Sequence, residues 1–305
     1  MYILGINAYH GDSSACLFKN ERLVFAIEEE RITRIKHQAG LPLNAIEACL
    51  NFENISIDQL NYITINRNPK QRFFHKLFYA LKNISRYNFF SDRLNNLSNI
   101  LNIENELEKK FGKFKKGKTV FIDHHDSHVA SSVFFSQFKE SNFLSIDGFG
   151  DFRSTVLGYF KQNKFKKIDD VCYPHSLGIL YSAITQFLGF ENYGDEYKLM
   201  GLAPYGNPIF YDELNNLLIN NQKTFKLNLK YFSHHQSRSD LTWINSYPRI
   251  EKLYSNELSN LLGDARNYND AITQRHKDIA ASLQLLYEEN LFKILNYLHA
   301  KSKIK

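Results

Sequence analysis

The sequence predicts a duplicated α/β fold with two lobes. Its 305 residues allow two domains at about 150 residues each. Residues 2–27 contain three short apolar stretches separated by polar turns, which is the pattern of an antiparallel three-stranded meander. The same arrangement, again with a polar turn after its first stretch, begins at residue 142. We therefore expect a first lobe over residues 1–140 and a second lobe over residues 141–305.

The first lobe should add helices and two further strands to its meander. Lys19-Asn20-Glu21 is a hairpin turn between two apolar runs. Ala45, Ile46, Cys49 and Leu50 recur at helical spacing and predict one buried helical face. In chain order, the expected elements are strands at 2–7, 15–19 and 22–27, a helix at 43–52, strands at 62–66 and 118–123, and a helix at 125–135.

Residues 70–111 are expected to be a helical insertion in the first lobe. Aromatic and aliphatic residues lie at helical spacing among Lys and Arg, so the helix is basic and amphipathic. Such a helix can lie on a membrane surface. We favour the alternative that its apolar face covers a core. The apolar positions are Phe73, Phe74, Leu77, Phe78, Leu81 and Ile84.

The second lobe repeats the meander and then becomes mainly helical. Its strands are expected at 142–146, 155–160 and 165–171, and a clean apolar alternation at 225–231 predicts another strand. Helices are expected at 177–188 and at about 270–298. The second of these helices has an apolar stripe at Ile279, Leu283, Leu286, Leu291, Ile294 and Leu298.

Composition excludes several classes of protein. Hydrophobic residues make up 43% and charged residues 23% of the chain, which excludes a disordered protein. No apolar run approaches the roughly 18 residues that a membrane-spanning helix needs. The N-terminus lacks the charged and apolar regions of a signal peptide. Cys16, Cys49 and Cys172 stand far apart, so we expect no disulfide framework and a cytoplasmic location.

The formal net charge of +6 comes partly from lysines at 109–118 and 161–167. Basic runs can contact nucleic acids. No RNA- or DNA-binding motif accompanies these runs, so we interpret them as solvated faces. The sequence therefore predicts no nucleic-acid partner.

A histidine pair is the first candidate for chemistry. His124 and His128 stand four residues apart at the start of an expected helix, which places both imidazoles on one face. Asp147 ends an apolar strand that should lie close by and is a plausible third ligand. Two histidines with a carboxylate suit iron or zinc. The alternative is that the histidines only cap a strand–helix junction.

Two polar turns are candidates for binding an anion. The glycines of Asp147-Gly148-Phe149-Gly150 permit close approach of backbone N–H groups to an anion, and residues 7–14 form the equivalent turn of the first lobe. Facing turns of this kind form the phosphate-binding cleft of actin, sugar kinases and Hsp70. The alternative is that both turns are ordinary hairpins.

Two further segments follow the expected strands and helices. Arg31, Arg34 and Lys36 belong to a charge run after the third strand and are candidates to hold phosphate or carboxylate. The segment 194–206 combines glycines, a proline and Lys198, which indicates an ordered loop over a site. A solvated sheet edge and a plain connection are the respective alternatives.

Seven motifs follow one another along the chain. They are Ile3-Leu-Gly-Ile-Asn-Ala-Tyr-His10-Gly-Asp12-Ser-Ser14, Glu29-Glu-Arg31-Ile-Thr-Arg34-Ile-Lys36-His37, His124-His-Asp-Ser-His128, Ile146-Asp147-Gly-Phe-Gly150, Pro174-His-Ser-Leu-Gly-Ile-Leu-Tyr181, Lys198-Leu-Met-Gly-Leu-Ala-Pro-Tyr-Gly206 and His276-Lys-Asp-Ile-Ala-Ala-Ser282. In this order the motifs resemble those of the carbamoyltransferases of nodulation-factor, cephalosporin and aminoglycoside biosynthesis (the NodU/CmcH type). The resemblance extends from residue 1 to about residue 290.

The resemblance implies an ATP-dependent O-carbamoyltransferase with an actin/Hsp70-like (ribonuclease H-like) N-terminal domain. In this family a C-terminal domain makes carbamoyl adenylate from carbamoyl phosphate and ATP. The N-terminal domain then moves the carbamoyl group to a hydroxyl of a sugar, an antibiotic or a lipid-linked oligosaccharide. The implied partners are thus a small-molecule hydroxyl acceptor and an adenylating domain, in the same chain or in another. Whether the protein forms a homodimer is left open by the resemblance.

The resemblance also implies roles for single residues. The metal ligands of the family fall on His124, His128 and Asp147, and the ion, usually iron, would bind the adenylate phosphate and polarise the carbamoyl carbonyl. His10 matches the histidine of the first turn, which either deprotonates the acceptor hydroxyl or orients the adenylate. The expected contacts to carbamoyl adenylate are Asp12, Ser14, Arg31, Lys36, Gly148, Gly150 and Lys198.

The sequence departs from the family pattern at its end. The family continues into a further strand, a Gly-Gly-Val-Ala-Leu-Asn-like turn and another aspartate ligand, none of which precedes Lys305. We therefore expect an incomplete second lobe, with three sheet strands against five in the first lobe, and no carbamoyl transfer by this chain alone. The alternatives are a non-catalytic or partner-dependent subunit and a sugar-kinase-like ATPase. The His-x3-His pair argues against the kinase.

Overall fold

The computed structural model describes residues 1–69, 71–72, 75–76, 79, 100–114, 117–219, 221, 223–236, 241–244 and 247–304. Two compact units make up the chain. The first unit comprises Met1–Ser127 with Leu241–Arg249, and the second comprises His128–Asp240 with Ile250–Lys305. Most of the expected insertion at 70–111 lies outside the described residues. Its described end contains helix α5 (Ile103–Phe111).

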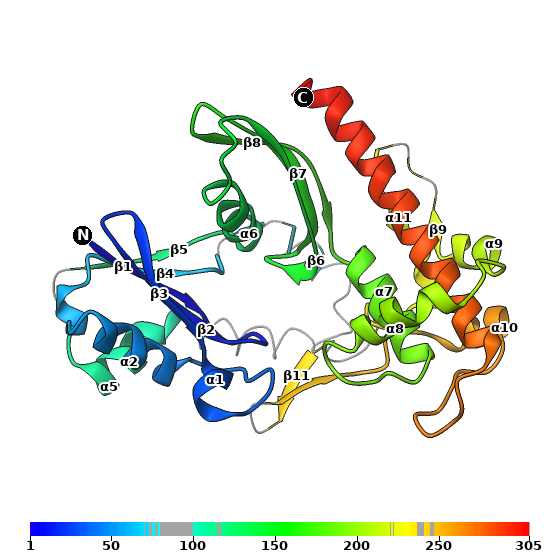
Figure 1. Ribbon diagram of the computed structural model, residues 1–305, viewed down its shortest axis with the longest axis horizontal. Coiled ribbons are helices and arrows are strands. Elements are labelled where there is room, and N and C mark those ends of the chain that lie inside the picture. The colour runs from blue at the N-terminus through cyan, green and yellow to red at the C-terminus, as the bar shows by residue number, and fades with distance from the viewer. Residues whose placement is uncertain are drawn as a thin grey trace. The chain divides into compact units, whose positions relative to one another are not determined.

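The first unit contains a five-stranded mixed sheet (Figure 1). Its strand order is β3-β2-β1-β4-β5. The first three strands are antiparallel, and β4 and β5 continue the sheet in parallel with β1. This order and these directions define a ribonuclease H-like lobe, so the predicted fold is confirmed. The strands are β1 (Tyr2–Asn7), β2 (Ser14–Lys19), β3 (Arg22–Glu28), β4 (Tyr62–Ile65) and β5 (Lys118–Phe121).

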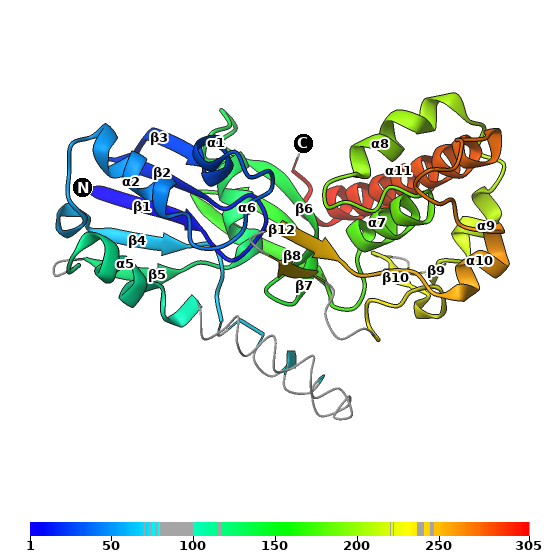
Figure 2. The ribbon, with the colours of Figure 1, turned by 90° about the horizontal axis from the view of Figure 1, so that it is seen from below.

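Helices α2 (Leu43–Phe52) and α5 lie on the same side of this sheet (Figures 1 and 2). The four apolar residues that predicted α2 from their spacing, including Cys49, are all buried. They pack against alternate strand residues such as Leu4 and Ile6 of β1. Ile103 and Leu107 of α5 join the same core. The described part of the first unit therefore has one continuous apolar core between sheet and helices.

The second unit begins with a three-stranded antiparallel sheet in the order β6-β7-β8. The strands are β6 (Ser141–Gly150), β7 (Arg153–Lys161) and β8 (Lys164–Cys172). In each unit the last hairpin of the meander turns through two residues with positive φ: Asn20 and Glu21 in the first, Gln162 and Asn163 in the second. Positive φ at both central residues is the backbone of a tight hairpin. The structural repeat predicted from the sequence is confirmed at this level.

Helix α6 (His124–Val133) packs against the sheet of the second unit. Val129 and Val133 contact Phe143 of β6 and Val156 of β7. The two compact units divide inside this helix, between residues 127 and 128. The lobe boundary expected at residue 140 separates the two sheets instead. The two divisions differ because α6 precedes the second sheet in sequence and yet packs on it.

The rest of the second unit is mainly helical. Its core joins α7 (Leu177–Phe187), α10 (Asn256–Leu262) and the 29-residue α11 (Gln274–Ser302). Five of the six residues of the predicted α11 stripe are buried, and Leu291 is half-buried. No helix among the described residues is long and apolar enough to cross a membrane. Shorter elements of the second unit are α8 (Glu196–Leu202), α9 (Tyr211–Asn215), β9 (Leu218–Ile219) and β10 (Lys226–Leu227). The first unit also contains α1 (Glu29–Thr33), β11 (Leu241–Ile244) and all but the last residue of β12 (Tyr247–Ile250).

The strand predicted at 225–231 is wrong beyond its start. Phe225 and Leu227 are buried around exposed Lys226, so the alternation holds for the short strand β10. The regular strand ends after Leu227, although the Asn228 backbone N–H still donates to the carbonyl of Leu217 in register with the β9–β10 pair. The Asn228 side chain donates to the carbonyl of Asn216. The next residues form a 3-10 helix.

Candidate functional site

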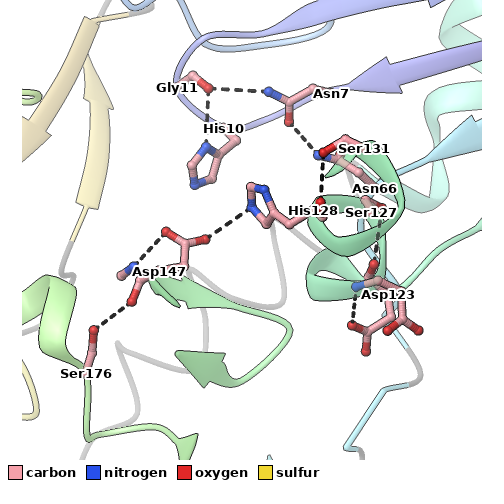
Figure 3. Close-up of polar contacts among 12 residues, drawn as sticks. Asn7, His10, Gly11, Asn66, Asp123, Ser127, His128, Ser131, Asp147 and Ser176 are labelled. Carbon is pink, nitrogen blue, oxygen red and sulfur yellow. Dashed lines mark hydrogen bonds and ion pairs between the residues drawn. The ribbon is translucent and has the colours of Figure 1, made fainter. Parts of the chain in front are cut away.

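Side-chain amides hold the turn between β1 and β2. The Asn7 amide nitrogen donates to the carbonyl oxygens of Gly11 at 3.5 Å and Asp12 at 2.9 Å. Asn66, which follows β4, donates to the Asn7 amide oxygen at 3.0 Å (Figure 3). Tyr9 and Asp12 have positive φ, 55° and 58°. The turn is thus fixed from inside by two asparagines rather than by regular sheet pairing.

His10 projects from this turn toward the start of α6. Its Nδ1 lies 3.2 Å from the Gly11 carbonyl oxygen, and its ring centroid lies 6.1 Å from that of His124. Both histidines belong to the first unit. The structure therefore brings the candidate base close to one of the candidate metal ligands, although the two residues are 114 positions apart in sequence.

Asp12 contacts a histidine that sequence reasoning did not single out. Its Oδ1 lies 2.8 Å from Nδ1 of His37. Two backbone hydrogen bonds, Tyr9 N–H to Gly40 O at 3.0 Å and Ser13 N–H to Gln38 O at 2.9 Å, hold this second segment along the turn. Ligand atoms of Asp12, Glu30 and His37 lie within 4.8 Å of one another. No signal in the sequence pairs Asp12 with His37, because their contact is tertiary.

Glu29, near the start of the charge run after β3, stabilises the fold. Glu29 is buried, and its carboxylate accepts from the backbone N–H groups of Asn44 and Ala45 at 3.2 and 2.8 Å. These donors lie at the first turn of α2, where an anion is stabilised. Arg31 is exposed and pairs with Glu28 at 3.3 Å, and Lys36 is also exposed. A role for Arg31 or Lys36 toward a bound anion stays a prediction.

The start of α6 carries the histidine pair. Asp123 accepts from the backbone N–H of Asp126 at 3.2 Å, which satisfies a donor of the first turn (Figure 3). His124 is buried one turn before the more exposed His128. The helix is continuous across the division between the compact units, so it carries both histidines.

Asp147 of β6 completes a group of three ligand atoms. Its Oδ2 lies 3.6 Å from Nε2 of His128. One ligand atom from each of His124, His128 and Asp147 lies within 4.8 Å of the others. The Asp147 carboxylate accepts from the His128 imidazolium and attracts its charge, which raises the pKa of His128, while partial burial opposes the shift. Two imidazoles and a carboxylate can hold a transition-metal ion.

The predicted Gly-rich turn at 147–151 is placed differently in the structure. Strand β6 continues to Gly150, which pairs with Arg153, with an irregular register after Ile146. Asp151 and Phe152, with φ of 49° and 70°, make the turn itself. The correction has a physical reason, because pairing with β7 outweighs the turn preference of Asp and Gly. Gly148 and Gly150 therefore lie in a bulged strand end, and their contact to a ligand stays a prediction.

Asp147 is held at both its backbone and its side chain. Its carbonyl oxygen accepts from the Ser176 hydroxyl at 2.8 Å, and its Oδ1 accepts from the Gly148 N–H at 2.6 Å (Figure 3). A Cβ atom at Gly178 would lie 2.9 Å from both the Asp147 oxygen and the Gly148 nitrogen, whereas a Cβ at Gly148 would meet nothing within 4 Å. Glycine at 178 thus permits α7 to approach the strand end closely.

The loop expected over a site at 194–206 is helical. Lys198 lies on α8, followed by a 3-10 helix at Ala203–Tyr205. Its ammonium pairs with Asp195 at 2.7 Å, and this contact raises the pKa of Lys198. Helical hydrogen bonding here outweighs the flexibility that Gly194 and Gly201 suggested. A contact between Lys198 and a cofactor stays a prediction.

The fold and the histidine-bearing helix beside a strand aspartate agree with the class implied by the sequence motifs. A family model described as "Carbamoyltransferase N-terminus" matches residues 2–305. The chain belongs to this carbamoyltransferase family.

Curated relatives extend well beyond the matched region. The uncharacterized protein sll1178 of Synechocystis is 36% identical over 97% of this chain and 48% of its own length. The nodulation protein NolNO of Sinorhizobium fredii is 29% identical over 95% of this chain and 39% of its own length. The chain therefore spans about half the length of these relatives or less.

The matching solved structures include one from Pseudomonas aeruginosa. YeaZ from Pseudomonas aeruginosa has a TM-score of 0.32 and 8% identity, and it aligns over 55% of this chain and 64% of its own. The fold assignment given above rests on the strand order within this chain.

Proposed function

We propose that this chain is the carbamoyl-transfer part of an ATP-dependent O-carbamoyltransferase. It would move a carbamoyl group from carbamoyl adenylate to a hydroxyl group of a small-molecule acceptor in the biosynthesis of a secondary metabolite or a glycan. Family membership supports the reaction class. The observation that carries the proposal is the group of His124, His128 and Asp147, whose ligand atoms lie within 4.8 Å of one another.

The donor set of this group fits a divalent metal ion. Two imidazole nitrogens and one carboxylate oxygen suit iron, our first expectation, and also zinc. Asp147 is suited to its role because its backbone and one carboxylate oxygen are already bonded to Ser176 and Gly148. When bound, the ion would act as a Lewis acid toward the carbamoyl carbonyl and the adenylate phosphate.

His10 is the proposed proton acceptor of the transfer step. The acceptor oxygen forms a bond to the carbamoyl carbon, the bond between that carbon and the phosphate oxygen breaks, and AMP leaves with the electron pair. The hydroxyl proton must go to a base. His10 is half-buried, on a turn fixed by Asn7, with its ring 6.1 Å from that of His124. Its alternative role is to orient the adenylate.

The remaining candidate residues would bind the adenylate. Gly148 borders open space, so a ligand can approach its backbone. Arg31 and Lys198 already pair with Glu28 and Asp195 and would have to exchange these partners for an anion. The proposed contacts are Asp12, Ser14, Arg31, Lys36, Gly148, Gly150 and Lys198. That the turns at 7–14 and 147–151 face each other across a cleft stays a prediction.

An adenylating domain, in cis or in trans, is the proposed partner. The relatives are about twice as long as the matched region or longer, which supports a division of labour between two parts. A partner-dependent or non-catalytic subunit of such an enzyme is the second candidate. Metal binding separates the two candidates, because a purely structural subunit has no need for an ion at His124 and His128.

Calorimetric titration tests the proposal. The wild-type chain should bind Fe²⁺ under anaerobic conditions, or Zn²⁺, at one site near this group, and His128→Ala should abolish that binding. His299→Ala is the matched control, since this exposed histidine lies at the end of α11. Equal affinities of wild type and His128→Ala would remove the metal assignment and favour the non-catalytic subunit.

A further inference from the structure

His234 is a buried histidine whose ring lies near Phe149, at the end of the strand β6 that also carries Asp147. His234 has 0% exposure. Its ring centroid lies 5.8 Å from Phe232, 6.0 Å from Phe149 and 6.1 Å from Tyr173. A phenylalanine would fill such an aromatic cluster without the cost of burying a polar ring. An imidazole at this place is compensated only if it makes hydrogen bonds.

One hydrogen bond of His234 is to the segment that follows β8. Its Nε2 lies 2.8 Å from the carbonyl oxygen of Pro174, which can only accept, so Nε2–H is the donor. Burial lowers the pKa of His234 to about 4, so the ring is neutral near pH 7. In return, the Tyr173 hydroxyl donates to the His234 carbonyl oxygen at 3.4 Å.

The segment 173–176 is in turn bonded to the hairpin that carries Asp147. The Tyr173 N–H donates to Phe152 O at 3.1 Å, and the Ser176 hydroxyl donates to Asp147 O at 2.8 Å. The Tyr173 ring also packs on Phe149, with 4.9 Å between centroids. A continuous set of contacts therefore runs from His234 through residues 173–176 to Asp147, all within the second unit.

We propose that His234 is a positioning residue for Asp147: by donating to Pro174 O it fixes the segment 173–176, which fixes the strand end that presents the carboxylate. This inference rests on the proposed metal site. Groups that orient a metal ligand without touching the ion typically change its affinity by about 10–100-fold. His234 acts through an intervening segment, so we expect an effect near the lower end of this range.

Two substitutions separate hydrogen bonding from packing. His234→Phe keeps a ring in the cluster and removes the donor. His234→Gln keeps an N–H donor near the position of Nε2. In a calorimetric titration with Zn²⁺ at pH 7, we expect the affinity of His234→Phe to fall by about tenfold and that of His234→Gln to stay close to wild type. His235→Gln is the control, because Nε2 of this neighbouring histidine lies 3.1 Å from the side-chain nitrogen of Gln236.

Hydrogen exchange gives a readout that does not depend on the metal. Amides of 147–150 and of Tyr173, His175 and Ser176 should exchange faster in metal-free His234→Phe than in wild type or His234→Gln, because the segment loses its hydrogen bond to His234. Circular dichroism checks that each variant is folded.

The outcomes are distinguishable. Wild-type binding with unchanged affinity in His234→Phe overturns the inference and leaves the metal site intact. Equal losses in His234→Phe and His234→Gln also overturn it, because an N–H donor at this position would then not preserve the affinity. If the wild type binds no metal, the proposed metal site fails, and the exchange experiment alone tests whether His234 fixes the segment 173–176. Unchanged exchange in His234→Phe then overturns the positioning role, and faster exchange supports it.

Discussion

The two strand-end turns that carry the candidate site are built by different means. In the first unit, the turn after β1 leaves the sheet and is held by amide side chains of Asn7 and Asn66. In the second unit, β6 stays paired as far as Gly150, and Ser176 bonds to the backbone of Asp147. One sequence pattern, an apolar strand followed by a polar turn, can thus give either a loop held by side chains or an extended strand. The strand end is suited to a fixed metal ligand, and the loop presents His10.

The largest expected effect comes from removing the carboxylate of the strand end. Asp147→Asn should weaken Fe²⁺ or Zn²⁺ binding by more than about 100-fold, because a charged ligand is lost rather than its surroundings. Asp12→Asn is the matched change in the loop and should leave affinity unchanged. Calorimetry on both variants measures this difference. A comparable loss in Asp12→Asn would move the ion to the group of Asp12, Glu30 and His37.

The next largest effect is expected where Gly178 of α7 packs closely against the backbone at the end of β6. Gly178→Ala should destabilise the chain by about 1–3 kcal/mol, because its Cβ would lie 2.9 Å from the backbone of Asp147 and Gly148. Gly148→Ala should change the free energy of unfolding by less than about 0.5 kcal/mol, since its Cβ meets open space. Denaturant unfolding followed by circular dichroism compares the two. If both variants are as stable as wild type, α7 does not pack on the strand end as described.

The loop should depend on its amide scaffold. Asn7→Ala removes hydrogen bonds to Asp12 O and from Asn66, so we expect about 1–2 kcal/mol of destabilisation. Exposed Asn51 of α2 provides the control, and Asn51→Ala should be neutral. Thermal melts of both variants check this. An unchanged melting temperature in Asn7→Ala would show that the loop is held by other contacts.

The smallest effect concerns pH. Asp147 raises the pKa of His128 above its usual value of about 6.5. Protons and a metal ion compete for the imidazole, so metal affinity should keep rising with pH above that value. In the metal-free chain, any stability from this contact is present at low pH and is lost as pH rises through the raised pKa. It should be small because the His128 side chain is 54% exposed.

A titration of the His128 ring signals by NMR measures this pKa directly. Asp147→Asn should lower it toward the usual histidine value, and Asp151→Asn, in the adjacent turn, should leave it unchanged. An identical pKa in wild type and Asp147→Asn would show that the two side chains do not interact in solution.

Periodicity explains which elements could be predicted from the sequence. Strands β1 and β2 bury alternate residues, and α2 and α11 bury one face each, so their apolar residues recur at the period of the element. Gly and Asp misled the prediction at 147–150, and Gly misled it at 194–206, because strand pairing and helical hydrogen bonds outweighed local turn preference. The alternation at 225–231 misled the prediction as well, because the chain enters a 3-10 helix at Leu229–Tyr231.

The candidate site likewise contains some residues that could be predicted from the sequence and others that could not. His124 and His128 could be found from their spacing, because a helix fixes which residues share a face. The contact of Asp12 with His37 and the burial of His234 are tertiary, and the surrounding residues give no periodic signal for either. Glu29 looked like part of a solvated charge run, and only the fold shows that it caps α2.

The reactivity of the buried Cys49 thiol can report how often the core of the first unit opens. Cys49 has 0% exposure within the core that joins α2 to the sheet, and burial raises its pKa to about 12. Only a thiolate attacks an alkylating reagent at an appreciable rate. The folded unit therefore protects Cys49 in two ways, because burial blocks the reagent and the raised pKa keeps the thiol protonated. Modification of Cys49 must then await an opening of this core. Its labelling rate under native conditions consequently measures the free energy of that opening, without any engineered probe.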